Sequence, residues 1–62
     1  MPMTPKQMEK LLIENGFVFQ RQRGSHRMFF NPKTKRFANV PMHCKDLKPG
    51  TEHQILKDAG LK

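Results

Sequence analysis

The sequence predicts an α+β domain with the element order α-β-β-β-α. Three observations indicate this fold: an amphipathic helical pattern near the start, three short runs rich in aromatic and β-branched residues, and a second helical pattern near the end. Strands joined by tight turns form an antiparallel meander, so both helices are expected on one face of a three-stranded sheet. The 62 residues are expected to form one domain over residues 1–62. A chain of this length buries only about 60% of its unfolded surface.

The first helix is predicted to begin at Thr4-Pro5 and to end at Gly16. Threonine is a good helix cap. Proline is tolerated at the first helical position because a backbone N–H there would have no partner within the helix. The residues at i, i+3, i+4 and i+7, which share one helix face, are Met8, Leu11, Leu12 and Asn15. Gly16 supplies the left-handed conformation that commonly ends a helix.

Three strands are predicted over residues 17–21, 26–31 and 36–40, with Pro41 closing the third. Residues 23–25 and 31–35 have turn composition. We expect the phenylalanines to be core residues, because the chain has few other large groups to bury; the alternative is that they are platforms on which bases stack.

A polar loop over residues 42–48 precedes the second helix, which is predicted to open at Pro49. Its expected buried positions are Ile55, Leu56 and Ala59. Gly60 is expected to end this helix, with Leu61 packing back on the last turn.

The charge of the chain predicts a polyanionic partner. The chain has twelve Lys and Arg residues but only five Asp and Glu residues, which gives a formal net charge of +7 and an isoelectric point near 10.2. This is the electrostatic footprint of a nucleic-acid-binding protein. A basic structural protein and a protein that binds an acidic partner protein have similar charge, so charge alone does not separate the three classes.

The composition also indicates where the protein works. The single cysteine, Cys44, forms no intramolecular disulfide, which fits a reducing compartment. No apolar run approaches the roughly 18 residues of a membrane span, and no apolar signal segment is evident. We therefore expect a cytoplasmic protein without a membrane partner, and a domain too small for a small-molecule cofactor.

The most informative motif is Gly24-Ser25-His26-Arg27, in which a flexible turn leads into a strand. Imidazole titrates near neutral pH in its unperturbed form, so His26 is a candidate general acid or base. Guanidinium groups bind phosphate oxygens in two-point geometry, and Arg21, Arg23 and Arg27 are predicted to lie beside His26. The alternative is that His26 is an ordinary surface residue at a turn.

Two further groups are candidates for the same site. His43 lies in a loop that can fold back over the sheet, where it would be a second acid–base group; otherwise it is a loop residue bonded to backbone. Lys45 and Lys48 are candidate RNA-binding residues in a basic rim that also includes Lys33, Lys35 and Arg36. The alternative for each of these residues is a solvated surface side chain. His53 is expected on the solvated face of the second helix.

A metal site is not expected from this sequence. The carboxylates are scattered, and Cys44 with the histidines lacks the ligand spacing of zinc sites. Cys44 is also a poor candidate nucleophile, because adjacent residues such as His43 and Cys44 point apart. A nuclease built from these residues would use the 2′-hydroxyl of RNA as its nucleophile, which requires no metal and which DNA lacks.

Several blocks of the sequence together resemble one protein family. They are TPKQMEKLLIENGF at residues 4–17, RQRGSH at residues 21–26, VPMH at residues 40–43, LKPGT at residues 47–51 and ILKDAGL at residues 55–61. In order and spacing they are similar to the HicA toxins of bacterial toxin–antitoxin systems. The resemblance implies a fold like that of double-stranded-RNA-binding domains, mRNA interferase activity, and a HicB-type antitoxin as partner. It also places the catalytic histidine of the family at His26, and family members often carry a histidine where His43 stands.

Two function hypotheses follow. The first is an endoribonuclease toxin that uses His26 to cleave single-stranded mRNA. The second is a small basic module that binds RNA without cleaving it. Replacing His26 separates them, because only the first hypothesis predicts a loss of cleavage. A DNA-binding regulator is a weaker third alternative, since no helix-turn-helix spacing supports it.

Overall fold

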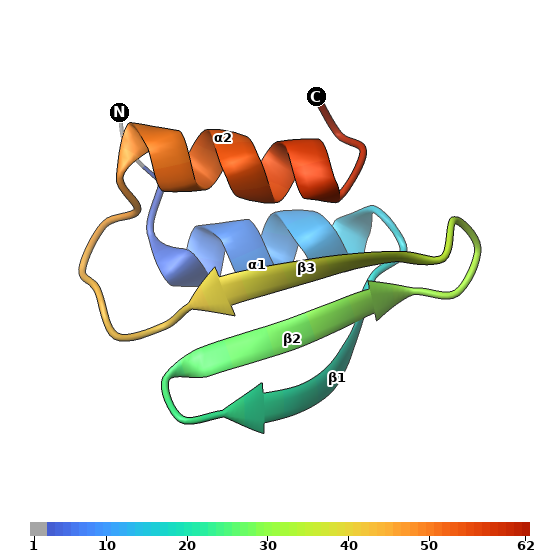
Figure 1. Cartoon of the computed structure of the whole chain (residues 1–62), viewed down its shortest axis with the longest axis horizontal. Coiled ribbons are helices and arrows are strands. Elements are labelled where there is room, and N and C mark those ends of the chain that lie inside the picture. Colours follow the sequence, from blue (N-terminus) through green and yellow to red (C-terminus); the bar gives the residue numbers. More distant parts are fainter. Residues whose placement is uncertain (1–2) are drawn as a thin grey trace.

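The computed structural model describes residues 3–62 and has the predicted order of elements (Figure 1). The elements are α1 (Pro5–Glu14), β1 (Val18–Arg23), β2 (His26–Asn31), β3 (Arg36–Pro41) and α2 (Pro49–Asp58). The strands form one antiparallel sheet in the order β1-β2-β3. The α+β fold class is therefore confirmed.

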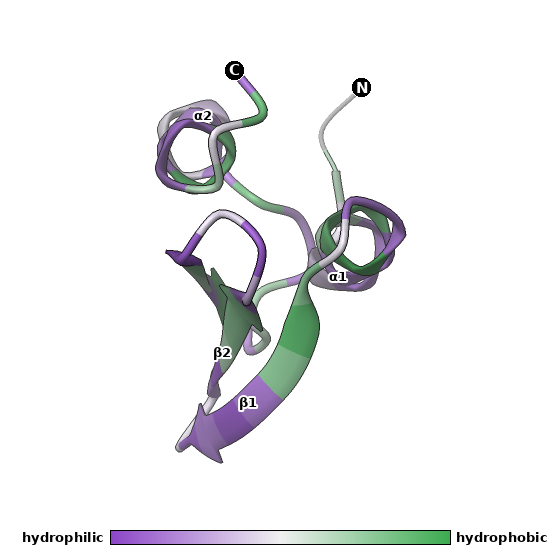
Figure 2. Ribbon diagram, turned by 90° about the vertical axis from the view of Figure 1, so that its right-hand side faces the viewer, coloured by the Kyte–Doolittle hydropathy of each residue, from purple (hydrophilic) through white to green (hydrophobic). Residues whose placement is uncertain are grey.

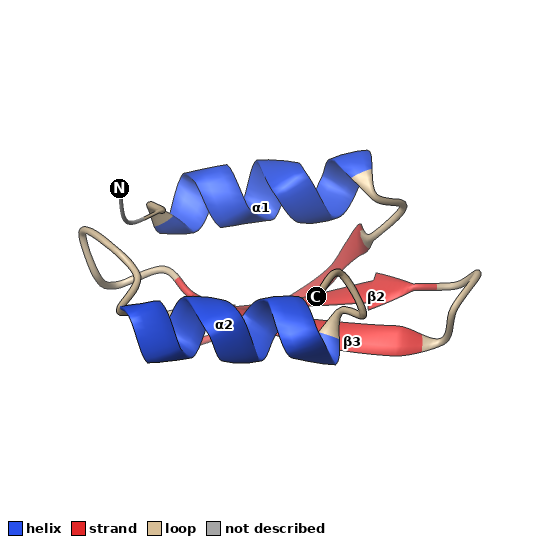
Figure 3. Cartoon of the chain, turned by 90° about the horizontal axis from the view of Figure 1, so that it is seen from above, coloured by secondary structure: helices blue, strands red, loops and turns tan. Residues whose placement is uncertain are grey.

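The two helices lie side by side on one face of the sheet, as Figure 3 shows from above. Seen along the strands in Figure 2, no element of the described residues covers the opposite face. The core fills the space between helices and sheet with Met8, Leu12, Phe17, Phe29, Ala38, Val40, Leu47, Ile55 and Ala59. Within residues 3–62, neither helix has the length and apolar character needed to cross a membrane.

Helix α1 begins and ends as its sequence predicts. The Thr4 hydroxyl accepts a hydrogen bond from the Gln7 N–H at 3.1 Å, and the Gln7 side chain accepts one from the Thr4 N–H at 2.9 Å. This reciprocal capping box satisfies two backbone donors of the first turn. Gly16 has φ +93°, which glycine adopts without steric cost. Asn15, which continues the face of Met8 and Leu12 in the sequence pattern, is exposed, and its side-chain amide donates to the Leu11 carbonyl at 2.7 Å.

The strand boundaries differ slightly from the prediction. Phe17 precedes β1 as a buried core residue, and β1 continues to Arg23 because only Gly24 and Ser25 separate it from β2. Gly24 has φ +60° at the first position of this two-residue loop, where type II′ hairpin turns place glycine. Pro41 is the last residue of β3, an edge strand on which a missing N–H is tolerated.

Ile55 of helix α2 and its C-cap residue Ala59 are buried as predicted, whereas Leu56 is half-buried. Gly60 has φ +76°, and the Leu61 N–H bonds the Leu56 carbonyl at 2.9 Å. The helix therefore ends with the expected backbone geometry. The Leu61 side chain remains exposed, so the prediction that it packs back on the last turn is wrong.

The side chain of Asn31 links the turn after α1 to the turn between β2 and β3 by hydrogen bonds. It is only 5% exposed, and its Nδ2 donates to the Asn15 carbonyl at 3.1 Å. Its Oδ1 accepts from the backbone N–H groups of Lys33 at 2.9 Å and Thr34 at 3.3 Å. The buried amide therefore holds the end of α1 against the β2–β3 turn.

Candidate functional site

A β-bulge in β1 decides which side chains reach the uncovered face of the sheet. Phe19 pairs with Phe29, yet the next pair is Arg21 with Met28, so Gln20 is an extra residue on β1. A bulge of this kind reverses the in–out alternation of the residues that follow it. Arg21 therefore lies on the uncovered face instead of facing the helices. We call the uncovered side of the sheet the open face.

His26 starts β2 on this open face, directly opposite Arg23 on β1 and Pro41 on β3. The short hairpin loop brings Arg23 and His26 together, because they are the residues on either side of Gly24-Ser25. Both side chains are exposed. The open face thus carries an imidazole with a guanidinium as its cross-strand neighbour.

The loop after β3 brings a second imidazole to His26. The Met42 N–H donates to the Ser25 carbonyl at 2.6 Å, which fastens this loop to the β1–β2 turn. The Ser25 hydroxyl lies 3.2 Å from Nδ1 of His43, and the centroids of the His26 and His43 rings are 5.8 Å apart. The expectation that the His43 loop folds back toward the sheet is confirmed in its geometry.

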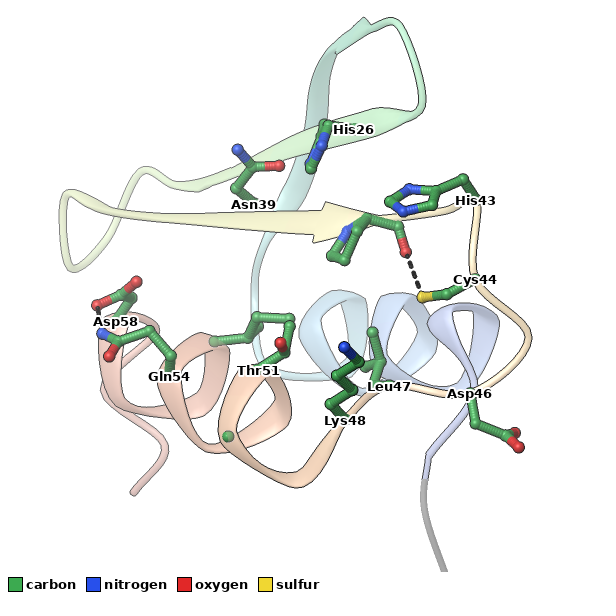
Figure 4. A pocket seen from close by; sticks show the side chains of 13 residues that line it. His26, Asn39, His43, Cys44, Asp46, Leu47, Lys48, Thr51, Gln54 and Asp58 are labelled. Atoms are coloured by element: carbon green, nitrogen blue, oxygen red, sulfur yellow. Dashed lines mark hydrogen bonds between the residues drawn. The ribbon is translucent and has the colours of Figure 1, made fainter.

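Two hollows meet at His26 and Asn39. A hollow of about 290 Å³ lies over the open face, and its lining residues are Arg21, Arg23, His26, Met28 and Asn39. A larger one of about 580 Å³ lies between β3 and α2 and includes His43. Figure 4 shows His26 and Asn39 entering the larger hollow from the strands and His43 entering from the loop.

The larger hollow also reaches the first turn of α2. Lys48 is the N-cap residue of this helix, and Gly50 and Thr51 follow it along the hollow. A helix N-terminus carries partial positive charge, to which Lys48 adds a full one. Asp46 and Asp58 also line the hollow, so its charge is mixed, in contrast to the hollow over the open face.

Arg27 does not lie beside His26, so that prediction is wrong. Successive residues of a strand point to opposite faces, and Arg27 faces the helices. Its guanidinium donates to the Glu9 carboxylate at 2.7 Å and lies 5.7 Å from the centre of the Phe19 ring. Arg27 is therefore an internal link between α1 and the sheet.

The predicted lysines are divided between separate surfaces. Lys48 lines the larger hollow with His26, whereas Lys45 lines a different depression formed with the start of α1. At the other end of the sheet, Arg36 donates to the Asp58 carbonyl at 3.4 Å and helps to cap α2. The basic rim expected from the sequence is thus not one continuous surface at His26.

Asn39 and Ser25 are the site residues that sequence reasoning missed. The alternation of β3 carries a signal for Asn39, because Ala38 and Val40 are buried and the residue between them must face outward. The contact between Ser25 and His43 had no comparable local signal, because 18 positions separate the two residues.

Cys44 and the potential metal ligands are arranged as follows. The Cys44 thiol donates to the Pro41 carbonyl at 3.6 Å, as Figure 4 shows. Over residues 3–62, no three side chains among His, Cys, Asp and Glu gather into a group that could hold a metal ion.

The fold and the site define a class of protein: a small basic α+β domain with a histidine and two arginines on an open sheet face. The family described as "HicA toxin of bacterial toxin-antitoxin" matches residues 5–61. The chain therefore belongs to the HicA toxin family, and it is the toxin of a toxin–antitoxin system. No curated protein gives a significant match. The resemblance seen in the sequence blocks is confirmed, and the family implies an antitoxin partner.

Proposed function

We propose that this toxin is an endoribonuclease that cleaves mRNA, with His26 as its catalytic residue. The observation that supports this best is the position of His26 on the open face, in one hollow with Arg21 and Arg23. Imidazole can take and give protons near neutral pH, and arginine binds phosphate oxygens. The hollow lies on the open face of the sheet, where a phosphate of an extended polymer can reach it.

The proposed reaction uses the RNA's own 2′-hydroxyl. Its oxygen forms a bond to the neighbouring phosphorus while an imidazole takes its proton. The bond from phosphorus to the 5′-oxygen breaks, and that oxygen receives a proton from a general acid. The products are a 2′,3′-cyclic phosphate and a 5′-hydroxyl end. Arg23 and Arg21 stabilise the charge that builds up on the phosphate oxygens.

His26 and His43 divide the two proton transfers between them in this proposal. Their ring centroids are 5.8 Å apart, so the two imidazoles can flank one phosphate. The contact from Ser25 to Nδ1 of His43 orients that ring and leaves Nε2 as the nitrogen that serves the substrate. Ser25 is a positioning residue in this scheme, because it acts only through His43.

The test is cleavage of a long mRNA by purified protein in excess EDTA. We expect cleavage to persist in the chelator, because the proposed chemistry uses only protein side chains and the 2′-hydroxyl. His26→Ala should lower the rate by about 10²- to 10⁴-fold, the usual effect of removing a general acid or base. His53→Ala is the matched control, since His53 is an exposed histidine on α2, outside both hollows that contain His26. Its rate should match that of the unchanged protein.

Two outcomes would contradict the proposal. Cleavage that stops in EDTA and returns with Mg²⁺ would show metal-dependent chemistry. Full cleavage by His26→Ala would remove His26 from the reaction. If the unchanged protein binds RNA but never cleaves it, the chain is the non-catalytic RNA-binding module, for which Arg21 and Arg23 alone would suffice.

A HicB-type antitoxin is the proposed inhibitor, and it is expected to be acidic and to cover His26. The net charge of +7 favours fast capture by a partner of opposite charge. We expect the association rate to fall as NaCl is raised, because salt screens this attraction. Stopped-flow mixing of the two proteins measures that rate. Hydrogen exchange that shows protection only on the helices would contradict direct covering of His26.

A further inference from the structure

The open face also carries a row of apolar side chains that the proposed chemistry does not use. Pairing across the sheet places Val18, Phe30 and Phe37 side by side on β1, β2 and β3. The rings of Phe30 and Phe37 are 4.8 Å apart between centroids, at an interplanar angle of 43°. We call these three residues the apolar row.

The exposure of this row was not expected. The sequence analysis expects the phenylalanines in the core rather than as base-stacking platforms, and Phe29 is indeed buried. Phe37, however, is 50% exposed, and Val18 beside the pair is also exposed. Adjacent apolar side chains left uncovered on a small domain commonly mark a binding surface.

The surroundings of the apolar row favour a nucleic-acid strand as its occupant. The next rows along the sheet contain Arg21 with Met28 and Asn39, and then Arg23 with His26 and Pro41. The three strands contain no Asp or Glu, so no carboxylate of the sheet repels a phosphate backbone. Aromatic rings on an antiparallel sheet, next to arginines, are the arrangement on which single-stranded RNA bases stack.

We propose that Phe37, supported by Phe30, is a base-stacking subsite for single-stranded RNA on the open face. The proposal rests on the proposed function, because the strand it binds is the one that His26 cleaves. Phe30 and His26 are four residues apart on β2, a distance of about 13 Å. The stacked base therefore belongs to a nucleotide near the scissile phosphate but not adjacent to it.

This subsite selects unpaired RNA. A ring on a sheet surface stacks only on a base whose face is free, and the bases of a duplex already stack on one another. Stacking also tolerates any base, because every base has a π-face. The open face would then hold the strand by its phosphates at Arg21 and Arg23 and by a base at Phe37.

The test is the binding of a fluorescently labelled single-stranded RNA, measured by anisotropy in the His26→Ala background to prevent cleavage. Phe37→Ala should weaken binding about 5- to 150-fold, which corresponds to the loss of one base–aromatic stack. Phe37→Leu should be similarly weak, because leucine keeps the apolar cover but lacks the ring. Phe37→Tyr should bind nearly as well as the parent.

Phe19→Ala is the matched control. Phe19 is a strand phenylalanine with 52% exposure, but it packs edge-on against the buried Phe29 on the other side of the sheet. Its replacement should change RNA binding by less than about 2-fold. A second arm uses a strand of the same length with abasic nucleotides. Its weaker binding should be insensitive to Phe37→Ala, because no base is present to stack.

Three results would overturn the inference. They are equal effects of Phe37→Ala and Phe19→Ala, an equal effect of Phe37→Ala on the abasic strand, or full binding by Phe37→Leu. Lost antitoxin capture with unchanged RNA binding would assign the apolar row to the protein partner instead. Failure of the proposed function has a different readout, the cleavage assay. In that case the unchanged protein would not cleave RNA, whatever effect Phe37→Ala has on RNA binding.

Discussion

The two faces of the sheet use the same residue types for different purposes. On the helix-covered face, Phe29 is buried and Arg27 is neutralised by Glu9. On the open face, Phe37 is half exposed and Arg23 forms no ion pair within residues 3–62. The covered face holds the domain together, and the open face keeps its charge and its apolar surface available.

The face of the sheet on which a residue lies, and not its position along the chain, determines its role in this domain. His26 and Arg27 are neighbours in sequence, yet one lies in the candidate site and the other ties a helix to the sheet. Three pairs of like residues, one member on the covered face and one on the open face, make this comparison testable: Phe29 and Phe37, Asn31 and Asn39, and Arg27 and Arg23. Each pair provides a test of the comparison.

The phenylalanine pair should show the largest effect on stability. Phe29→Ala removes a fully buried ring and should lower the free energy of unfolding by about 3–5 kcal/mol, enough to unfold many domains of this size. Phe37→Ala should cost about 1 kcal/mol or less, since half of its surface is already exposed. Urea denaturation followed by circular dichroism measures both, with Phe29→Leu as a milder variant if Phe29→Ala does not fold. Equal losses would contradict the assignment of the two faces.

The asparagine pair should show a smaller difference of the same sign. Asn31→Ala removes a buried amide that bonds three backbone groups, and should destabilise the fold by about 1–3 kcal/mol. Asn39→Ala, on the open face, should change the free energy of unfolding by less than about 0.5 kcal/mol. Thermal melts of the two variants give the comparison. A larger loss for Asn39→Ala would mean that the open face also carries structural bonds.

Most of the fold could be predicted because its signals are local. The Thr4-Pro5 start and the Gly16 end bound α1, and the two-residue loop Gly24-Ser25 fixes the hairpin. At Leu61 the backbone hydrogen bond formed as expected, but the side chain stays exposed, since a backbone pattern does not determine side-chain packing.

The site was less predictable because it depends on which face each strand residue occupies. Successive side chains of a strand point to opposite faces, so Arg27 and His26 cannot share a face, and the prediction that grouped them did not apply this rule. The bulge at Gln20 is different, since no local pattern marks it, and it alone moves Arg21 to the open face. The contact between Ser25 and His43 likewise depends on how the loop after β3 meets the hairpin turn.

The arginine pair tests most directly the claim that the open face is the RNA-cleaving face. The measurement is the cleavage rate of one RNA substrate by Arg23→Gln and by Arg27→Gln, after thermal melts show that both are folded. Arg23→Gln should be about 10- to 150-fold slower, the loss expected for one charge-assisted bond to phosphate. Arg27→Gln should stay within about 2-fold of the unchanged protein, because its partner is Glu9 and not the substrate. Equal losses, or a larger loss for Arg27→Gln, would contradict the account.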